Sequence, residues 1–318
     1  MLTTRFVDDA LCWTDVTTPD PEGAASFYRA LFGWTYRFAG PEGGGYGFLE
    51  RAGRIVAGCA PLTGAQGPAA WTVYFRASDA AAAADAASEA DADADADAEA
   101  DADADADAAS DADADADAAA TSDAASDAAA AAAADAAADA VRRAGGSVPA
   151  PPVSVGEQGR SAVLAGQMGA APGVWQPGER GGLESVGEAG GLCWAELYTP
   201  DVARAAAFYH AVLGWETSAV TFPGGVYTTV SSRGTAEEGA CGGMVPLADD
   251  LVEAEENRPH WLPYIGAEDP DAVAARAAEP GGRVRMLPAS IPGVGRLARL
   301  EDPHGARFAV LRGDPRET

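Results

Sequence analysis

The chain has 318 residues, which is enough for two domains with ordinary hydrophobic cores. Its formal net charge of −28 is largely local, because residues 79–139 hold 20 Asp and Glu and neither Lys nor Arg, which leaves −8 for the remainder. A moderately acidic body without basic patches argues against a nucleic-acid partner. The sequence has no run of about 18 apolar residues, so no membrane-spanning helix is predicted, and the N-terminus lacks the pattern of a signal peptide. We therefore expect a cytoplasmic protein.

The four cysteines are Cys12, Cys59, Cys193 and Cys241. They lie within apolar, strand-like runs, and none of them has CxxC spacing. Closely spaced ligand pairs, which a zinc site needs, are missing from the sequence. The cysteines are therefore interpreted as buried free thiols in a reducing compartment.

The sequence contains an internal repeat. Residues 11–34 read LCWTDVTTPDPEGAASFYRALFGW and residues 192–215 read LCWAELYTPDVARAAAFYHAVLGW, with 13 of 24 positions identical. In each copy a β-rich run ends at Thr-Pro-Asp, and the Asp (Asp20 or Asp201) can cap the helix that follows. Gly33 and Gly214 are expected to end these helices. The first part of each copy is thus predicted to be a strand followed by an amphipathic helix and further strands.

The same pattern starts again within each copy. A strand at 71–77, an Ala-rich helix ending near 146 and strands at 160–165 and 172–176 complete the first copy. In the second copy a strand at 261–266, a helix at 270–279 and strands at 296–300 and 306–311 follow. Each copy therefore has the order β-α-β-β-β twice, and the chain holds four such modules.

An acidic insertion interrupts the first copy. About 50 residues of Asp-Ala alternation precede Val141, where the second copy has a helix of about ten residues. Like charges at i and i+4 oppose a helix, and alanine alone cannot offset the ordering entropy. The segment 80–138 is therefore predicted to be a solvated, low-complexity spacer.

These modules resemble those of a known superfamily. The C-W-x-[DE] strand, the T-P-D cap and the F-Y-x-x-[LV]-[FL]-G-W helix end are similar to those of the vicinal oxygen chelate proteins, which include glyoxalase I, bleomycin-resistance proteins and extradiol dioxygenases. The resemblance implies an α+β fold in which four βαβββ modules pair into two glyoxalase-like domains with cup-shaped mixed sheets. The first domain would span residues 1–180, a linker 181–190 and the second domain 191–313.

In that superfamily a divalent metal sits inside the cup, held by the first and last strands of each module. Counted from the capping Asp and the last turn, the corresponding positions hold no His or carboxylate but Trp13, Thr72, Gly173, Trp194, Leu262 and Ala309. We therefore predict no cofactor and the loss of the usual metal set. A relocated divalent metal held by Glu196 and His260 stays open, although a catalytic metal usually has three protein ligands.

The candidate site residues follow from strand alternation, which places residues two apart on one face. Trp13 and Trp194 either form the base of the cups, on which a planar ligand stacks, or fill the cups as part of the hydrophobic core. Asp15 and Glu196 face the cups beside them, and each needs a partner because an unpaired buried carboxylate is costly. The partner could be an arginine, such as Arg76 or Arg307, or a bound ligand. Alternatively, the carboxylate could serve in acid-base catalysis. Further inward donors are predicted at Tyr74, Tyr198 and Tyr264.

Three functions are compatible with these residues. The preferred one is binding of a small molecule in aromatic-floored cups, with Glu196 and His260 as the catalytic candidates if the protein is an enzyme. The alternatives are a glyoxalase-, dioxygenase- or hydroxylase-like enzyme with a relocated or absent metal site, and a scaffold with self-filled cups. His210 and His304 are expected on the surface, and a monomer or a homodimer is compatible with the duplication.

Overall fold

Two mixed sheets of eight strands form the protein in the computed structural model, which describes residues 2–40, 44–63, 68–77, 147–165, 169–222, 225–235, 239–247 and 258–314. The first sheet comprises β1 (Leu11–Thr18), β2 (Thr35–Phe38), β3 (Gly47–Arg51), β4 (Arg54–Pro61), β5 (Ala70–Arg76), β6 (Ser147–Ser154), β7 (Gly159–Ala165) and β8 (Gly173–Pro177). A short 3₁₀ helix, η2 (Gly156–Gln158), joins β6 to β7. The second sheet comprises β9 (Leu192–Thr199), β10 (Glu216–Phe222), β11 (Gly225–Ser231), β12 (Ala240–Pro246), β13 (His260–Gly266), β14 (Arg283–Ile291), β15 (Gly295–Glu301) and β16 (Arg307–Gly313).

The strand orders confirm the predicted pairing of modules. The first sheet has the order β2-β3-β4-β1-β5-β8-β7-β6, and the second has the same order as β10-β11-β12-β9-β13-β16-β15-β14. In each sheet the first strands of the two modules lie side by side and antiparallel, as β1 with β5 and β9 with β13. The fold is therefore the α+β arrangement of four βαβββ modules. The predicted helix of the second module and the acidic insertion lie outside the described residues.

The helices begin directly after the aspartates that were expected to cap them. Asp20 accepts a hydrogen bond from Gly23 N (2.9 Å) at the start of α1 (Pro21–Phe32), and Asp201 accepts one from Arg204 N (3.0 Å) at the start of α4 (Val202–Leu213). Asp269 caps α5 (Pro270–Ala277) in the same way. The helix α5 ends two residues earlier than expected, because Glu279 precedes a proline and that position disfavours helical backbone.

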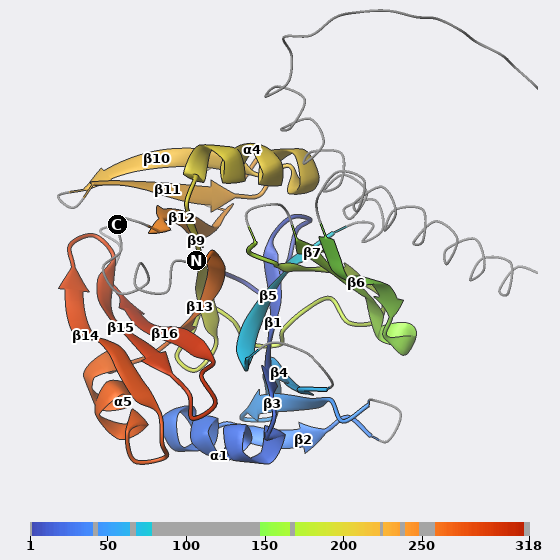
Figure 1. The fold of residues 1–318 in the computed structure, drawn as a ribbon, viewed down its shortest axis with the longest axis vertical. Coiled ribbons are helices and arrows are strands. Elements are labelled where there is room, and N and C mark those ends of the chain that lie inside the picture. The colour runs from blue at the N-terminus through green and yellow to red at the C-terminus, as the bar shows by residue number, and fades with distance from the viewer. Residues whose placement is uncertain are drawn as a thin grey trace, which may run out of the picture.

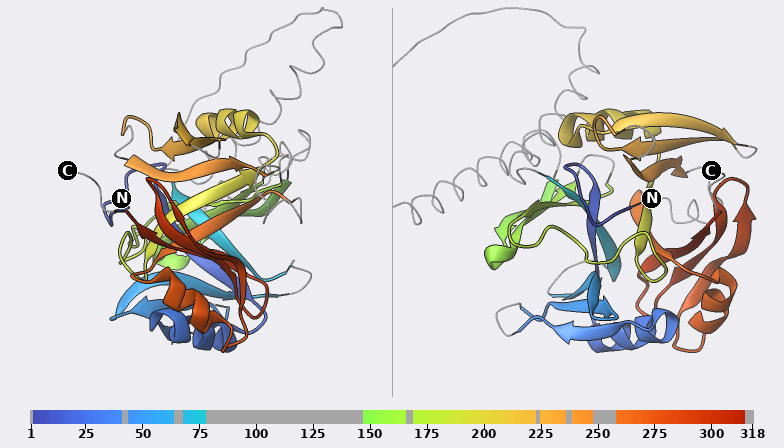
Figure 2. Two further views of the ribbon diagram at one scale, coloured as in Figure 1. Left: turned by 90° about the vertical axis from the view of Figure 1, so that its left-hand side faces the viewer. Right: turned by 180° about the vertical axis from the view of Figure 1, so that it is seen from behind.

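The two domains share one hydrophobic core. Helix α1 of the first domain lies beside α5 of the second (Figure 1), and Phe27 on α1 packs edge-on against Phe308 of β16 at 6.2 Å. At the other contact, Phe75 of β5 packs against Trp215 (4.5 Å) and Trp261 (5.2 Å) of the second domain. Figure 2 shows the packed sheets from two further sides. The faces turned toward this shared core are opposite to those that carry the candidate site residues.

The chain between the sheets is also packed. The first sheet lies within residues 1–180 and the second within 191–313. Of the predicted linker 181–190, Leu183 and Val186 are buried, and Leu183 N donates to Cys12 O (2.9 Å). Among the described residues no helix has the length and hydrophobicity to span a bilayer.

Candidate functional site

Strand alternation gives each sheet one face with a tryptophan and a carboxylate. In β1 the side chains of Trp13 and Asp15 share a face, and in β9 those of Trp194 and Glu196 do. We call these faces the first cup and the second cup. On the neighbouring strand, Tyr74 lies opposite Trp13 in the first cup, and Tyr264 lies opposite Trp194 in the second cup.

In the second cup, three tyrosine hydroxyls converge on one carboxylate. Glu196 accepts hydrogen bonds from Tyr198 (2.7 Å) and Tyr264 at Oε2 and from Tyr227 (2.9 Å) at Oε1. The indole N–H of Trp194 donates to the Tyr227 hydroxyl at 2.9 Å. Burial, and next the charge of Glu196, raises the pKa of Tyr227 and of Tyr264 well above that of free tyrosine. The phenols therefore stay protonated and act as donors to the carboxylate.

The first cup repeats this arrangement with a shorter acid. Asp15 accepts from the Tyr46 hydroxyl (3.3 Å), and the Trp13 indole N–H donates to the same hydroxyl (3.2 Å). Burial raises the pKa of Asp15 to about 6, against the opposing effect of hydrogen bonds from Tyr74 and Tyr46. Each cup thus contains the same unit of tryptophan, carboxylate and phenols.

Two members of this unit were missed from the sequence, Tyr46 and Tyr227. Each follows the cup tryptophan by 33 residues, a spacing that a longer alignment of the two copies would have found. Glycines make room for both hydroxyls: a Cβ at Gly58 would lie 1.8 Å from the Tyr46 hydroxyl, and one at Gly243 would lie 2.1 Å from that of Tyr227. The glycines of β4 and β12 are therefore part of the site.

Of the two arginines expected as partners of the carboxylates, Arg76 pairs elsewhere. Arg76 ends β5 and forms an ion pair with Asp8 of the N-terminal segment at 3.0 Å. Arg307 lies opposite Glu301 in the register of β15 and β16. The hydrogen bond to Asp15 comes from Tyr46 rather than from Arg76, and three tyrosines donate to Glu196.

The first cup is closed by aromatic side chains of its own. Trp175 stacks on Trp13 with ring centroids 6.4 Å apart and an angle of 21°, and Phe48 meets Trp13 edge-on at 6.2 Å. At the equivalent positions, two residues beyond Ala309 and Tyr227, the second cup has Leu311 and Thr229. The side chains at these two positions are therefore smaller in the second cup than in the first.

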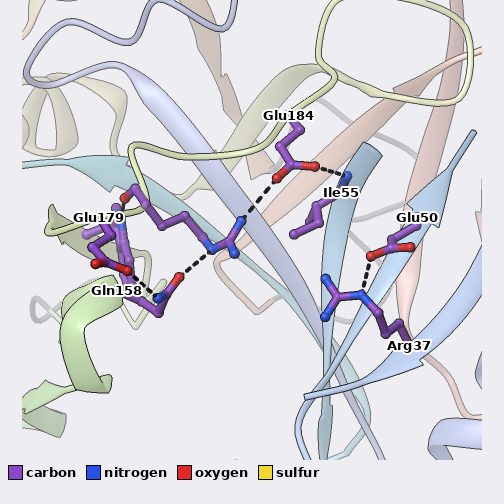
Figure 3. Close-up of polar contacts among 8 residues, drawn as sticks. Arg37, Glu50, Ile55, Gln158, Glu179 and Glu184 are labelled. Atoms are coloured by element: carbon purple, nitrogen blue, oxygen red, sulfur yellow. Dashed lines mark hydrogen bonds and ion pairs between the residues drawn. The ribbon is translucent and has the colours of Figure 1, made fainter. Parts of the chain in front are cut away.

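Ion pairs also cover the rim of the first cup. The guanidinium groups of Arg37 and Arg180 lie 4.7 and 5.2 Å from the centroid of Phe48. Arg37 pairs with Glu50, and Arg180 reaches Glu184, whose other oxygen accepts from the backbone N–H of residue 55 (Figure 3). These side chains tie β2, β3 and β4 to the segment after β8.

The second cup has an additional polar end. The ring of His260 stacks on Tyr198 at 5.1 Å, and the guanidinium carbon of Arg299 lies 5.0 Å from the centroid of the same ring. Thr17 stands at the position in the first cup that corresponds to Tyr198, and Val163 at the position of Arg299. The predicted candidates Glu196 and His260 are thus brought to one cup, with Tyr198 between them. By contrast, His210 is exposed on α4 as predicted.

The usual metal positions of the superfamily do not fit a divalent cation here. Of these positions, Thr72 lies opposite Asp15, whereas Trp13 and Gly173 align with Tyr74 between them, and a Cβ at Gly173 would lie 2.0 Å from the Tyr74 ring. A carboxylate side chain at that position would therefore displace the tyrosine. In the second cup Leu262 lies opposite Glu196, and Trp194 and Ala309 align with Tyr264 between them. Among the described residues, no group of three or more His, Cys, Asp and Glu side chains could hold a metal ion.

Comparison with known proteins places this fold in a class. The profile of the glyoxalase/bleomycin resistance protein/dioxygenase superfamily matches residues 191–310. The 2,3-dioxygenase LapB from Pseudomonas sp. KL28 shares the fold with a TM-score of 0.53 at 13% identity, over 98% of this chain and 95% of LapB. These matches agree with the paired βαβββ modules described above.

Two relatives extend the match to the whole chain. "Putative glyoxylase CFP32" of Mycobacterium tuberculosis is 33% identical over 310 residues, 96% of this chain and 95% of CFP32. "Anthracycline biosynthesis protein DnrV" of Streptomyces peucetius is 32% identical over 328 aligned positions, 97% of this chain and 94% of DnrV. The chain belongs to the glyoxalase/bleomycin resistance protein/dioxygenase superfamily.

Proposed function

We propose that this protein binds a planar aromatic small molecule in the second cup, with the ligand ring on Trp194 and a ligand hydroxyl donating to Glu196. The observation that carries the proposal is the difference in exposure between the cups. Trp13 and Asp15 are each only 6% exposed, whereas Trp194 and Glu196 are half-buried. An aromatic floor beside a few polar groups is typical of small-molecule sites.

The hydrogen bonds of Glu196 support a ligand donor. A carboxylate offers about four acceptor positions, two on each oxygen. Oε2 accepts from Tyr198 and Tyr264, and Oε1 accepts from Tyr227, so Oε1 retains one position. A hydroxyl is the matching group, because a second acceptor on the ligand would repel the carboxylate. The three phenols hold the carboxylate in place before the ligand arrives, which reduces the entropy lost on binding.

The relatives support a polycyclic ligand. DnrV is named for anthracycline biosynthesis, which is a pathway to polycyclic aromatic compounds. The closed first cup offers a parallel within this chain, since Trp175 already stacks on the tryptophan there. Since metal donors are absent from the usual positions, we propose recognition by stacking and hydrogen bonding. A glyoxalase-like metal enzyme is the alternative that the experiment below separates.

The test is calorimetric titration of the full chain with 2-naphthol, a planar aromatic ring system with one hydroxyl. We expect one binding site per chain. Glu196→Gln should weaken binding about 10- to 100-fold, because a hydrogen bond to a charged group contributes about 1.5–3 kcal/mol. Trp194→Leu should weaken it through loss of the ring contact.

The matched control is Asp15→Asn in the closed first cup, which should bind 2-naphthol as the wild type does. Wild-type affinity in both Glu196→Gln and Trp194→Leu would overturn the proposal, as would equal loss in Asp15→Asn. Metal analysis of the purified protein adds a second criterion. Stoichiometric manganese, iron, nickel or zinc that is lost in Glu196→Ala would favour the metal enzyme.

A further inference from the structure

Each sheet ends in two edge strands, and three of the four that the structure describes are poor templates for pairing with another chain. The edge strand β2 has only four residues and contains Arg37, which pairs with Glu50. The edge strand β6 contains three prolines, and β14 contains Pro288 together with Arg283 and Arg285. Short length, charge and proline, which has no N–H to donate, all oppose the addition of a further strand.

The fourth edge strand, β10, has none of these protections. Its seven residues, ETSAVTF, include no proline, and their single charge is that of Glu216 at the first position. The residues from Glu216 to Thr221 are all exposed. Figure 1 shows β10 at the outer border of its sheet, and among the described strands β11 is its only neighbour. A long, exposed edge that is almost free of charge is a site for strand addition.

Two side-chain contacts show which backbone groups of β10 face outward. The hydroxyl of Ser231 donates to the carbonyl oxygen of Glu216 (3.4 Å), which lies opposite it in register. The hydroxyl of Thr229 donates in the same way to the carbonyl oxygen of Ser218 (3.1 Å). These carbonyls point toward β11, and the backbone groups of successive residues in an antiparallel strand point to opposite sides. The residues that direct their N–H and C=O groups to the open edge are therefore Thr217, Ala219 and Thr221.

We propose that β10 pairs antiparallel with β10 of a second copy of this chain, about a two-fold axis at Ala219, so that the protein is a homodimer. This register sets Ala219 opposite Ala219, and Thr217 opposite Thr221 of the second copy. Each outward N–H then meets an outward C=O, because the outward residues are spaced symmetrically about Ala219. The cross-strand threonine pairs also stabilise the interface. Such a two-fold interface, in which both copies use the same surface, is the commonest kind in homo-oligomers.

Charge and chain order favour a second copy over a peptide as the occupant of this edge. The two Glu216 residues would lie at opposite ends of the strand pair, about 20 Å apart, because strands rise about 3.4 Å per residue. That separation exceeds the Debye length of about 8 Å at physiological salt, so these like charges do not oppose pairing. Both strands are already extended within their own sheets, whereas a disordered peptide would lose entropy on binding. The inference is independent of the ligand proposed for the second cup.

The experiment is sedimentation equilibrium of the full chain from about 1 to about 100 μM, at about 0.15 M salt to screen the long-range repulsion between acidic chains. We expect the average mass to rise with concentration from 32.1 kDa toward twice that value. Ala219→Pro removes an N–H that points away from β11, so it leaves the hydrogen bonds between β10 and β11 in place and should be monomeric throughout. Ala219→Ser keeps the N–H and is the matched control, which should dimerise as the wild type does.

Two further variants keep the test decisive if Ala219→Pro does not fold. Ala219→Lys places two like charges directly opposite each other in the proposed register and should weaken association about fivefold or more. Ala219→Cys tests the register itself, because mild oxidation should join the two copies through this position. The matched control is Leu287→Cys on the proline-containing edge β14, where the native side chain is 76% exposed. It should give no covalent dimer.

Three results would overturn the proposal. The first is a wild type that stays at 32.1 kDa up to the highest concentration, whatever other strand its edge accepts. The second is a dimer that neither Ala219→Pro nor Ala219→Lys weakens, with both variants folded by circular dichroism, because its interface would then lie elsewhere. The third is equal cross-linking of Ala219→Cys and Leu287→Cys, which would indicate random collision rather than a defined register.

Discussion

Replacing Asp15 with asparagine should remove a pH dependence of stability that the first cup imposes. Burial raises the pKa of Asp15 from 3.8 to about 6, so the folded protein binds this proton more tightly than the unfolded chain. The stabilisation is complete below pH 4 and is lost as the pH rises through about 6. At about 1.4 kcal/mol per pKa unit, the free energy of unfolding falls by about 3 kcal/mol across this window. Asp15→Asn stays neutral and avoids this loss.

The assay is urea unfolding of wild type and Asp15→Asn at several pH values between 4 and 7. We expect the difference in unfolding free energy to shift by about 3 kcal/mol in favour of the variant as the pH rises. Asp9 and Asp302 also have raised pKa values, but both proteins contain them, so their contributions cancel in the difference. Thr72→Val, which removes no titratable group opposite Asp15, should follow the wild-type profile. A constant difference between pH 4 and 7 would refute the reasoning.

Three further changes test the site and the insertion. Leu311→Trp should close the second cup and weaken 2-naphthol binding at least tenfold, while Trp175→Leu should open the first cup and raise the stoichiometry from one to two by calorimetry. An unchanged stoichiometry in Trp175→Leu would contradict the equivalence of the cups. Gly243→Ala places a Cβ against the Tyr227 hydroxyl and should cost about 1–3 kcal/mol in a urea melt, whereas a loss below about 0.5 kcal/mol would show that the site relaxes freely. Deleting 85–135 should leave the melting temperature nearly unchanged, because doubling a loop costs only about 0.6 kcal/mol; a large loss of folded protein would contradict the spacer prediction.

The elements that the sequence predicted are those with local causes. The caps at Asp20 and Asp201 act on backbone N–H groups three residues away, so spacing alone identifies them. The faces of Trp13 and Asp15 follow from strand alternation, which is equally local. The edge strands β2, β6, β10 and β14 were not located, because each of them pairs on one side only and lacks the clear pattern of a strand in the sheet interior.

The partners of the carboxylates could not be predicted because they depend on the register between strands. Tyr227 lies on β11, which does not pair with β9 directly but reaches Glu196 across the glycine of β12. Arg76 has the right parity to face Asp15, but its place at the end of β5 brings it to Asp8. The odd or even position of a residue along its strand determines the face on which its side chain lies. Only the register between strands determines which neighbouring side chain it contacts.

The closed first cup shows that the carboxylate and its phenols can have a purely structural role. Asp15 has its own hydrogen-bond donors beneath aromatic rings, so this unit satisfies a buried acid without any ligand. The unit by itself therefore does not distinguish the second cup from the first. The argument lies in what differs between the cups: in the part of the chain that the structure describes no aromatic ring stacks on Trp194, whereas Trp175 stacks on Trp13, and Trp194 and Glu196 are more exposed than Trp13 and Asp15. Duplication preserved the structural unit in both cups, and the differences between them are why we propose the second cup as the binding site.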